Sequence, residues 1–171
     1  MTSVPTGDEP IRIEPYDPAW PARFERERAR LAELLGDRAP GGIHHVGSTA
    51  VPGLAAKPVI DILVGVADLE RSKALIEPLA ALEYVYAPYR AGQMHWLCKP
   101  DPARRTHHLH LVPTASERFR EELAFRDLLR ADPASAPEYA RLKARLAERF
   151  EHDREAYTEG KSAFIRSALG A

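Results

Sequence analysis

The sequence feature that most constrains the fold is a short apolar run, Val59-Ile60-Asp61-Ile62-Leu63-Val64. Aliphatic residues, most of them β-branched, fill all but one of its positions, which is typical of a central strand buried on both faces. Such a strand needs other strands along its edges and helices over its faces. The run therefore predicts an α/β (α+β) domain with a sheet at its centre.

Other short apolar segments indicate the rest of this sheet. Gly, Pro and Asp residues separate them, as is usual for turns between strands. They predict further strands at 42–46, 84–86, 95–98 and 107–112, and a short edge strand at 11–13.

Helical patterns precede the sheet and interrupt it. Asp17 followed by Pro18 predicts the start of a first helix, because Asp is a favoured N-cap and Pro a favoured first helical residue. Gly36 supplies its stop. Asp68 is a candidate cap for a second helix, carried by apolar residues up to Leu79.

The C-terminal third is helical in pattern. Thr114–Glu117 has the spacing of a capping box, and an apolar stripe follows it. Ser135 opens another helix, and a last helix is expected to be interrupted or kinked near Gly160. The predicted organisation is a helix, a small mixed sheet, and then helices packed on it.

Length and composition set limits on the class of protein. The 171 residues suit one domain, expected at 11–171 after a disordered tail at 1–10. A net charge of −1 gives no basic field for a nucleic-acid backbone, so no nucleic-acid partner is expected. Cys98 is the one cysteine, which fits a reducing compartment. With no apolar run of membrane-spanning length and no signal-peptide pattern, we expect a cytoplasmic protein.

Asp61 is the sharpest candidate for chemistry. An ionised carboxylate in a buried strand is costly unless it is paired or binds a ligand. Strand alternation places it on the same face as Val59 and Leu63. A salt bridge to a nearby Arg or Lys would also explain it.

Gly47-Ser48 follows the predicted strand at 42–46. Because Gly lacks a Cβ atom, a backbone amide and a hydroxyl could approach a phosphate closely at this point. A strand carboxylate shortly afterwards could hold the metal ion that neutralises such a phosphate. A simple turn would explain the pair equally well.

A histidine cluster occupies the last predicted strand. Alternation places His108 and His110 on one face, with His107 on the other. Two imidazoles on one face can bind a metal, act as acid and base, or contact phosphate. A structural hydrogen bond would also explain either of them. The basic residues of the C-terminal helices, Lys143 and Lys161 included, are expected by themselves to be solvated surface.

Residues 45–64, HVGSTAVPGLAAKPVIDILV, resemble the signature of the GrpB family. The similarity extends over about residues 11–168 and includes shorter matching segments at 16–20, 105–110, 125–127 and 157–165. GrpB proteins are small, mostly bacterial members of the nucleotidyltransferase superfamily. The resemblance implies the polymerase-beta-like fold, a small mixed sheet flanked by helices. Similar domains are fused to dephospho-CoA kinases in some bacteria, which points to nucleotide or coenzyme metabolism.

The superfamily pattern implies roles for particular residues. A Gly-Ser pair holds nucleotide phosphates, and a following strand carries two carboxylates at alternate positions for two Mg²⁺ ions. The resemblance assigns phosphate binding to Gly47, Ser48 and Thr49, and phosphate neutralisation to Lys57, Lys143 and Lys161. It assigns metal binding or catalysis to Asp61, with His108 and His110 in place of a further acid.

The sequence departs from that pattern at the alternate neighbours of Asp61. These are Val59 and Leu63, so the paired carboxylate is missing. One carboxylate with two imidazoles favours Mn²⁺ or Zn²⁺ over Mg²⁺. The leading hypothesis is a metal-dependent transferase that moves a nucleotidyl or phosphoryl group from a nucleoside triphosphate to a small acceptor. The alternatives are an inactive nucleotide- or coenzyme-binding module and a His/Asp metal-dependent phosphohydrolase.

Overall fold

The computed structural model describes residues 9–170. Most of the disordered tail expected at 1–10 therefore lies outside the described residues. Glu9 and Pro10 are described, and both line a cleft that also includes His108.

Five strands of the described chain form one mixed sheet in the order β1-β2-β5-β4-β3. The strands β2 and β5 are parallel, and the other neighbours are antiparallel. This arrangement confirms the expected mixed sheet, with the apolar run on the interior strand β2 between β1 and β5. The bounds are β1 Gly42–Val46, β2 Ile60–Val66, β3 Val85–Tyr86, β4 His95–Pro100 and β5 Arg105–Pro113.

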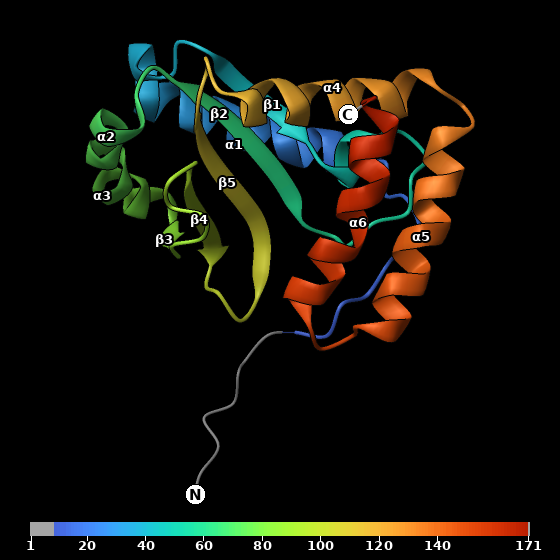
Figure 1. Ribbon diagram of the computed structural model, residues 1–171. Helices are drawn as coiled ribbons and strands as arrows, with labels where there is room; N and C mark the ends of the chain where they lie inside the picture. Colours follow the sequence, from blue (N-terminus) through green and yellow to red (C-terminus); the bar gives the residue numbers. More distant parts are fainter. Residues whose placement is uncertain (1–8, 171) are drawn as a thin grey trace, which may run out of the picture.

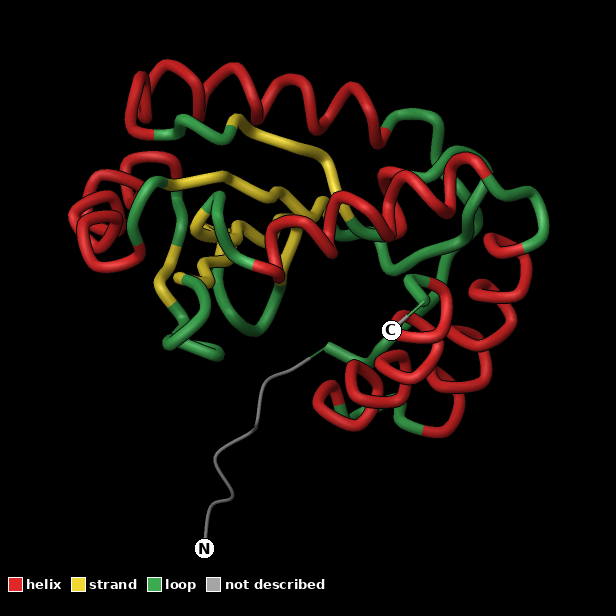
Figure 2. Tube along the Cα trace, turned by 45° about the horizontal axis from the view of Figure 1, so that its top comes forward, coloured by secondary structure: helices red, strands yellow, loops and turns green. Residues whose placement is uncertain are grey.

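Helices cover both faces of the sheet and extend beyond it (Figure 1). The first three helices pack on one face together with the main apolar core, and α4 packs on the other. Helices α5 and α6 lie side by side at one end of the molecule in both views (Figure 2). The bounds are α1 Trp20–Leu35, α2 Leu69–Ser72, α3 Ile76–Leu79, α4 Glu117–Ala131, α5 Ser135–Arg149 and α6 Arg154–Ala168.

Alternation along β2 separates a core face from a polar one. Ile62 and Val64 are fully buried in the main core, which α1 helps to form. Asp61 lies on the opposite face, where it is level with His108 of β5. Asp61 of β2 and His108 of β5 therefore both lie on the sheet face that α4 covers.

The N-terminal elements differ from the sequence prediction. The Asp17 carboxylate accepts a hydrogen bond from the Ala19 amide at 2.8 Å, so the cap prediction is close, but α1 begins only at Trp20. Residues 11–13 form no strand. The amide of Ile11 donates to the carbonyl of Glu151, which follows α5. The nearest β-type pairing is an isolated bridge between Glu14 and Ala56.

Two predictions about helix ends also need correction. The cap of α4 is Ser116, whose hydroxyl accepts from the amide of Phe119, rather than Thr114. Helix α6 is continuous through Gly160. This glycine permits close packing of α6 on α5, because a Cβ atom there would lie 2.5 Å from a methyl group of Leu146. The segment after Asp68 is capped as expected but breaks into short α and 3₁₀ turns.

Gly65 in β2 provides a test of this packing. A Cβ atom on it would lie 2.6 Å from the Cα of Gly41 and 2.8 Å from the ring of Phe119. We expect Gly65→Ala to destabilise the protein by about 1–3 kcal/mol, as overpacking of a buried site does, which lowers Tm by roughly 3–10 °C. Thermal melts measure the effect. Gly92→Ala is the matched control, because nothing lies within 4 Å of a Cβ atom at that exposed position; an unchanged Tm for Gly65→Ala would refute the prediction.

Candidate functional site

The turn after β1 brings the backbone against the carboxylate of β2. Val46, the last residue of β1, pairs with Asp61. Gly47 follows with φ 72°, in the left-handed region that favours glycine. A Cβ atom on Gly47 would also collide with the Asp61 carboxylate. Both the turn and the close approach therefore require glycine at this position.

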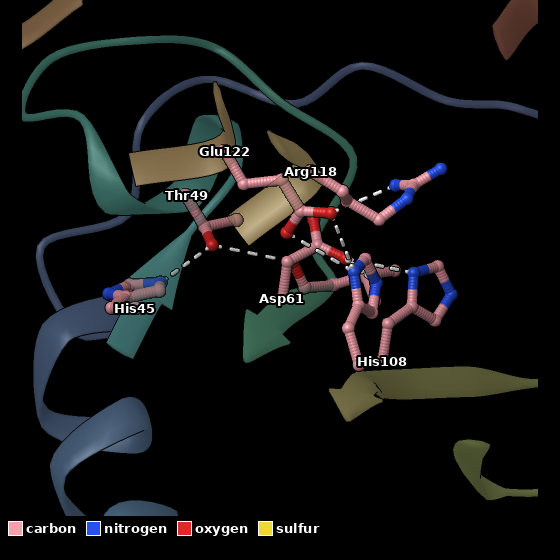
Figure 3. Close-up of polar contacts among 8 residues, drawn as sticks. His45, Thr49, Asp61, His108, Arg118 and Glu122 are labelled. Carbon is pink, nitrogen blue, oxygen red and sulfur yellow. Dashed lines mark hydrogen bonds and ion pairs between the residues drawn. The ribbon is translucent and has the colours of Figure 1, made fainter. Parts of the chain in front are cut away.

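Parallel pairing of β2 and β5 aligns Asp61 with two imidazoles. Asp61 is level with His108, and Leu63 is level with His110. His108 Nδ1 lies 2.9 Å from Asp61 Oδ1 (Figure 3). His110 Nε2 lies 4.0 Å from the same oxygen. One potential ligand atom from each of the three residues lies within 4.8 Å of the other two. The structure thus brings together the three residues that the sequence singled out.

Glu122 of α4 completes this cluster, and the sequence analysis missed it. Its carboxylate lies 3.4 Å from His110 Nδ1 and accepts a hydrogen bond from Arg118 at 3.0 Å (Figure 3). In the sequence it stands next to Glu121 in a charged helical segment. Nothing local distinguishes it from a solvated glutamate.

Burial and neighbouring charges set the protonation of this cluster. Burial tends to raise the pKa of Asp61, but the hydrogen bond from His108 and the charges of His108, His110 and Lys57 lower it well below its usual value. Burial lowers the pKa of His108 to about 4, against the opposing effect of Asp61. His108 is therefore neutral at pH 7, and it donates its Nδ1 proton to the carboxylate.

His110 behaves in the opposite way. Burial lowers its pKa, but Glu122 and Asp61 outweigh this effect and raise it above the ordinary value. Burial in turn raises the pKa of Glu122, and the charge of His110 outweighs that effect and lowers it. His110 therefore holds a proton more tightly than an ordinary imidazole does.

Three buried atoms of the cluster have no hydrogen-bond partner among the described residues: His108 Nε2, His110 Nε2 and Glu122 Oε2. Unpaired buried polar atoms are costly and call for an explanation. A metal ion fits here, because two ligand atoms of one ion can lie up to about 4.2 Å apart, twice a typical bond of about 2.1 Å. The 4.0 Å between Asp61 Oδ1 and His110 Nε2 is within that limit.

Ser48 contacts a buried lysine. Lys143 of α5 is 2% exposed, and its amine donates to the hydroxyl of Ser48 at 2.7 Å and to the carbonyl of Ala55 at 2.6 Å. Burial, together with the charges of Lys161 and Lys57, lowers the pKa of Lys143 to about 7. The sequence by itself predicts a solvated side chain at Lys143, whereas the family resemblance places it at a phosphate.

Lys57 and Lys161 lie beside this contact. Their amines approach the ring of Tyr157 at 5.0 and 4.6 Å from its centroid. Burial and the charge of Lys57 lower the pKa of Lys161 to about 8. Within residues 9–170, neither these two lysines nor Lys143 has a carboxylate in ion-pair contact. We call Lys57, Lys143 and Lys161 the lysine cluster; Asp61 raises the pKa of all three, so it is the nearby opposing charge.

Thr49 is placed differently from the other predicted phosphate ligands. It is buried, and its hydroxyl lies 2.9 Å from His45 Nε2 and 3.4 Å from the carbonyl of Val59 (Figure 3). Its hydroxyl is thus already engaged inside the protein.

A cleft of about 390 Å³ adjoins the cluster at His108. It lies among the N-terminal segment, the loop before β2, the start of β5 and the start of α6. The lining residues are Glu9, Pro10, Ile11, Arg12, Glu14, Lys57, Pro58, Val59, Arg105, His108 and Arg154.

Comparison with solved structures identifies the class of the fold. The GLD-2/RNP-8 complex matches with a TM-score of 0.55 at 15% identity, over 86% of this chain and 58% of that one. The Cid1 poly(U) polymerase matches with a TM-score of 0.52 at 13% identity, over 80% and 43%. The chain therefore has the nucleotidyltransferase fold.

The family follows from closer relatives. A model of the GrpB protein family matches residues 10–170, and the chain belongs to that family. The crystal structure of GrpB from Enterococcus faecalis has a TM-score of 0.82 at 35% identity, covering 93% of this chain and 95% of that one. The UPF0157 protein PA4798 of Pseudomonas aeruginosa is 43% identical over an alignment of 169 positions, which covers 95% of this chain and 68% of that protein.

A longer relative shares the domain. A dephospho-CoA kinase of Mycolicibacterium paratuberculosis is 33% identical over a gapped alignment of 186 positions, which covers 93% of this chain but only 45% of that protein. Among the described helices of the present chain, none combines the length and the apolar character needed to cross a membrane.

Proposed function

We propose that the protein transfers a nucleotidyl group from a nucleoside triphosphate to a small acceptor in a metal-dependent reaction. The lysine cluster carries this proposal. Three cationic side chains gather beside Ser48 without a carboxylate in contact within the described chain, and burial depresses their pKa values. Such an arrangement is costly in the free protein and favourable once a polyanion binds.

The donor triphosphate would bind over the turn at Gly47. The exposed backbone there and the Ser48 hydroxyl would contact phosphate oxygens, and the lysine cluster would neutralise them. Lys143 would fix the position of the Ser48 side chain, because its amine already donates a hydrogen bond to that hydroxyl. The lysines thus hold the donor against the end of β2.

Asp61 and His110 would hold the metal ion. Glu122 would orient His110 through Nδ1 and leave Nε2 directed at the ion, an arrangement common for metal-binding histidines. The mixed oxygen and nitrogen donors favour Mn²⁺ or Zn²⁺ over Mg²⁺. When bound, the ion would neutralise phosphate charge and polarise the phosphorus.

His108 would accept the proton of the acceptor. Its Nδ1 proton is held by Asp61, and its buried Nε2 has no hydrogen-bond partner among the described residues. His108 also lines the cleft. The acceptor oxygen forms a bond to the α-phosphorus while the bond from that phosphorus to the bridging oxygen breaks. Pyrophosphate leaves, and the acceptor proton moves to His108 Nε2.

A non-catalytic nucleotide-binding module is the second candidate. The observation in its favour is that Val59 and Leu63 occupy the positions beside Asp61 where the superfamily carries a second carboxylate. It predicts nucleotide binding without pyrophosphate release at any metal concentration. A phosphohydrolase would instead release orthophosphate from simple phosphate esters. Assays of pyrophosphate and orthophosphate release therefore distinguish the transferase, the binding module and the phosphohydrolase.

Isothermal titration calorimetry tests the shared element of these proposals. The four nucleoside triphosphates are titrated into the protein with Mg²⁺, Mn²⁺ or Zn²⁺ and without metal. We expect binding that a metal strengthens, most with Mn²⁺ or Zn²⁺. If no triphosphate binds under any of these conditions, the proposed function is wrong.

The lowered pKa values of Lys143 and Lys161, about 7 and 8, predict two pH dependences of opposite sign. Both amines are protonated at pH 6.5 and lose protons toward pH 9, so affinity for inorganic tripolyphosphate without metal falls over this range. The unfolded chain keeps its lysine protons to about pH 10.4. Between pH 7 and 9.5 the unfolded state therefore binds more protons, and the unliganded protein gains stability as pH rises.

Calorimetry at pH 6.5, 7.5 and 9 measures the affinity, and urea melts in the same buffers measure the stability. A tripolyphosphate affinity that grows from pH 6.5 to 9 would contradict the placement of the phosphates on these lysines.

A further inference from the structure

The cleft beside His108 differs from the lysine cluster in the way it is built. Its cationic side chains come from four separate segments: Arg12 before α1, Lys57 before β2, Arg105 at the start of β5 and Arg154 at the start of α6. Segments far apart in sequence thus direct positive charge into one space. Among the described residues, these four cationic side chains line the cleft together with the carboxylates of Glu9 and Glu14.

The cleft offers charge with little aromatic surface. Among its described lining residues the one aromatic ring is that of His108, which packs against Trp96 with the ring centroids 4.9 Å apart, so little ring surface is left for a nucleobase to stack on. Its volume of about 390 Å³ is at the lower end for small-molecule sites. Guanidinium groups are the side chains best suited to bind a phosphate or carboxylate through two hydrogen bonds. A compact anion without a base is therefore the ligand that this lining fits.

The cleft also opens onto the reaction centre. His108 belongs to its lining and is hydrogen-bonded to Asp61 at 2.9 Å. Lys57 belongs to both sites, because it lines the cleft and also lies over the ring of Tyr157 beside Lys161. A molecule in the cleft would thus stand next to phosphates held by the lysine cluster.

We propose that this cleft is the acceptor site and that the acceptor is a small phosphorylated alcohol. Its phosphate is held by Arg12 and Arg154, and its free hydroxyl points toward His108. This assignment rests on the proposed transferase function for the direction of the hydroxyl, whereas binding of the phosphate follows from the cleft alone.

Calorimetry with glycerol 3-phosphate and with inorganic phosphate tests the proposal on the full chain. Arg12→Gln combined with Arg154→Gln removes two cations of the cleft and leaves the lysine cluster intact. We expect the double variant to bind glycerol 3-phosphate at least about 10-fold more weakly than the wild type. Its affinity for a nucleoside triphosphate with Mn²⁺ should stay within about 2-fold. Arg145→Gln, at an exposed position of α5, is the matched control and should change neither affinity.

Two results would overturn the acceptor assignment. In the first, glycerol 3-phosphate binds the double variant and the wild type with equal affinity, or binds neither protein. The cleft then holds no phosphate. The double variant could instead lose triphosphate affinity to the same extent, which would place the donor in the cleft. Arginine-dependent binding of glycerol 3-phosphate by a wild type that binds no triphosphate would refute the transferase function and leave the cleft as an anion site. A circular-dichroism melt confirms that each variant is folded.

Discussion

Asp61→Asn is expected to abolish metal-dependent nucleotide binding while the protein stays folded. The amide keeps the shape of the carboxylate and can still accept the hydrogen bond from His108, now 2.9 Å from Oδ1. It removes the charge that would hold the ion together with His110. Loss of even an outer partner of a metal ligand weakens metal affinity about 10–100-fold, so loss of the ligand itself should weaken it at least as much.

A thermal-shift series measures this effect. Ligand at 100 times its dissociation constant stabilises a protein by about 2.7 kcal/mol, which corresponds to a rise in Tm of roughly 5–11 °C for a chain of this size. We expect that rise with triphosphate and Mn²⁺ for the wild type and for Asp37→Asn, a control at an exposed aspartate. An equal rise for Asp61→Asn would exclude Asp61 from the site. Collapse of its fold in a circular-dichroism melt would make the residue structural instead.

Lys143→Met is expected to separate binding from stability. Methionine fills a similar volume in the buried space, while the charge and both hydrogen bonds, to Ser48 and to the carbonyl of Ala55, are lost. A charge-assisted hydrogen bond contributes about 1.5–3 kcal/mol, so triphosphate affinity should fall roughly 10- to 150-fold. Removing a buried ammonium without a carboxylate in contact among residues 9–170 should leave Tm unchanged or raise it.

Calorimetry and thermal melts of the same preparation check both parts. Lys73→Met is the control, because this exposed lysine pairs only with Glu70 at the surface. If Lys143→Met lowers Tm by several degrees and binds triphosphate normally, the lysine is a structural tether of the turn to α5 and does not bind phosphate.

The sequence predicted the sheet well because its strands carry strong local signals. The run around Asp61 has one polar position among aliphatic ones, and the register that aligns it with His108 follows from burial of the alternate residues of both strands. The errors lie at element ends. The local sequence of Ile11–Ile13 predicts a strand. The amide of Ile11 instead donates to the carbonyl of Glu151, 140 positions later in the chain. Gly160 reads as a helix break, but tight packing against Leu146 accommodates it.

The sequence by itself determined the family and an interior strand of the sheet. It also singled out Gly47, Ser48, Asp61, His108 and His110 as candidates, because each stands in a short pattern with a distinct local meaning. Only the tertiary structure decided which charges meet. Glu122 looks like any helical glutamate, and Lys143 and Lys161 look like any surface lysines, until α4, α5 and α6 pack against the sheet. Burial and electrostatic contact depend on residues distant in the chain. Their effects on charge, partner and pKa are therefore properties of the packed molecule.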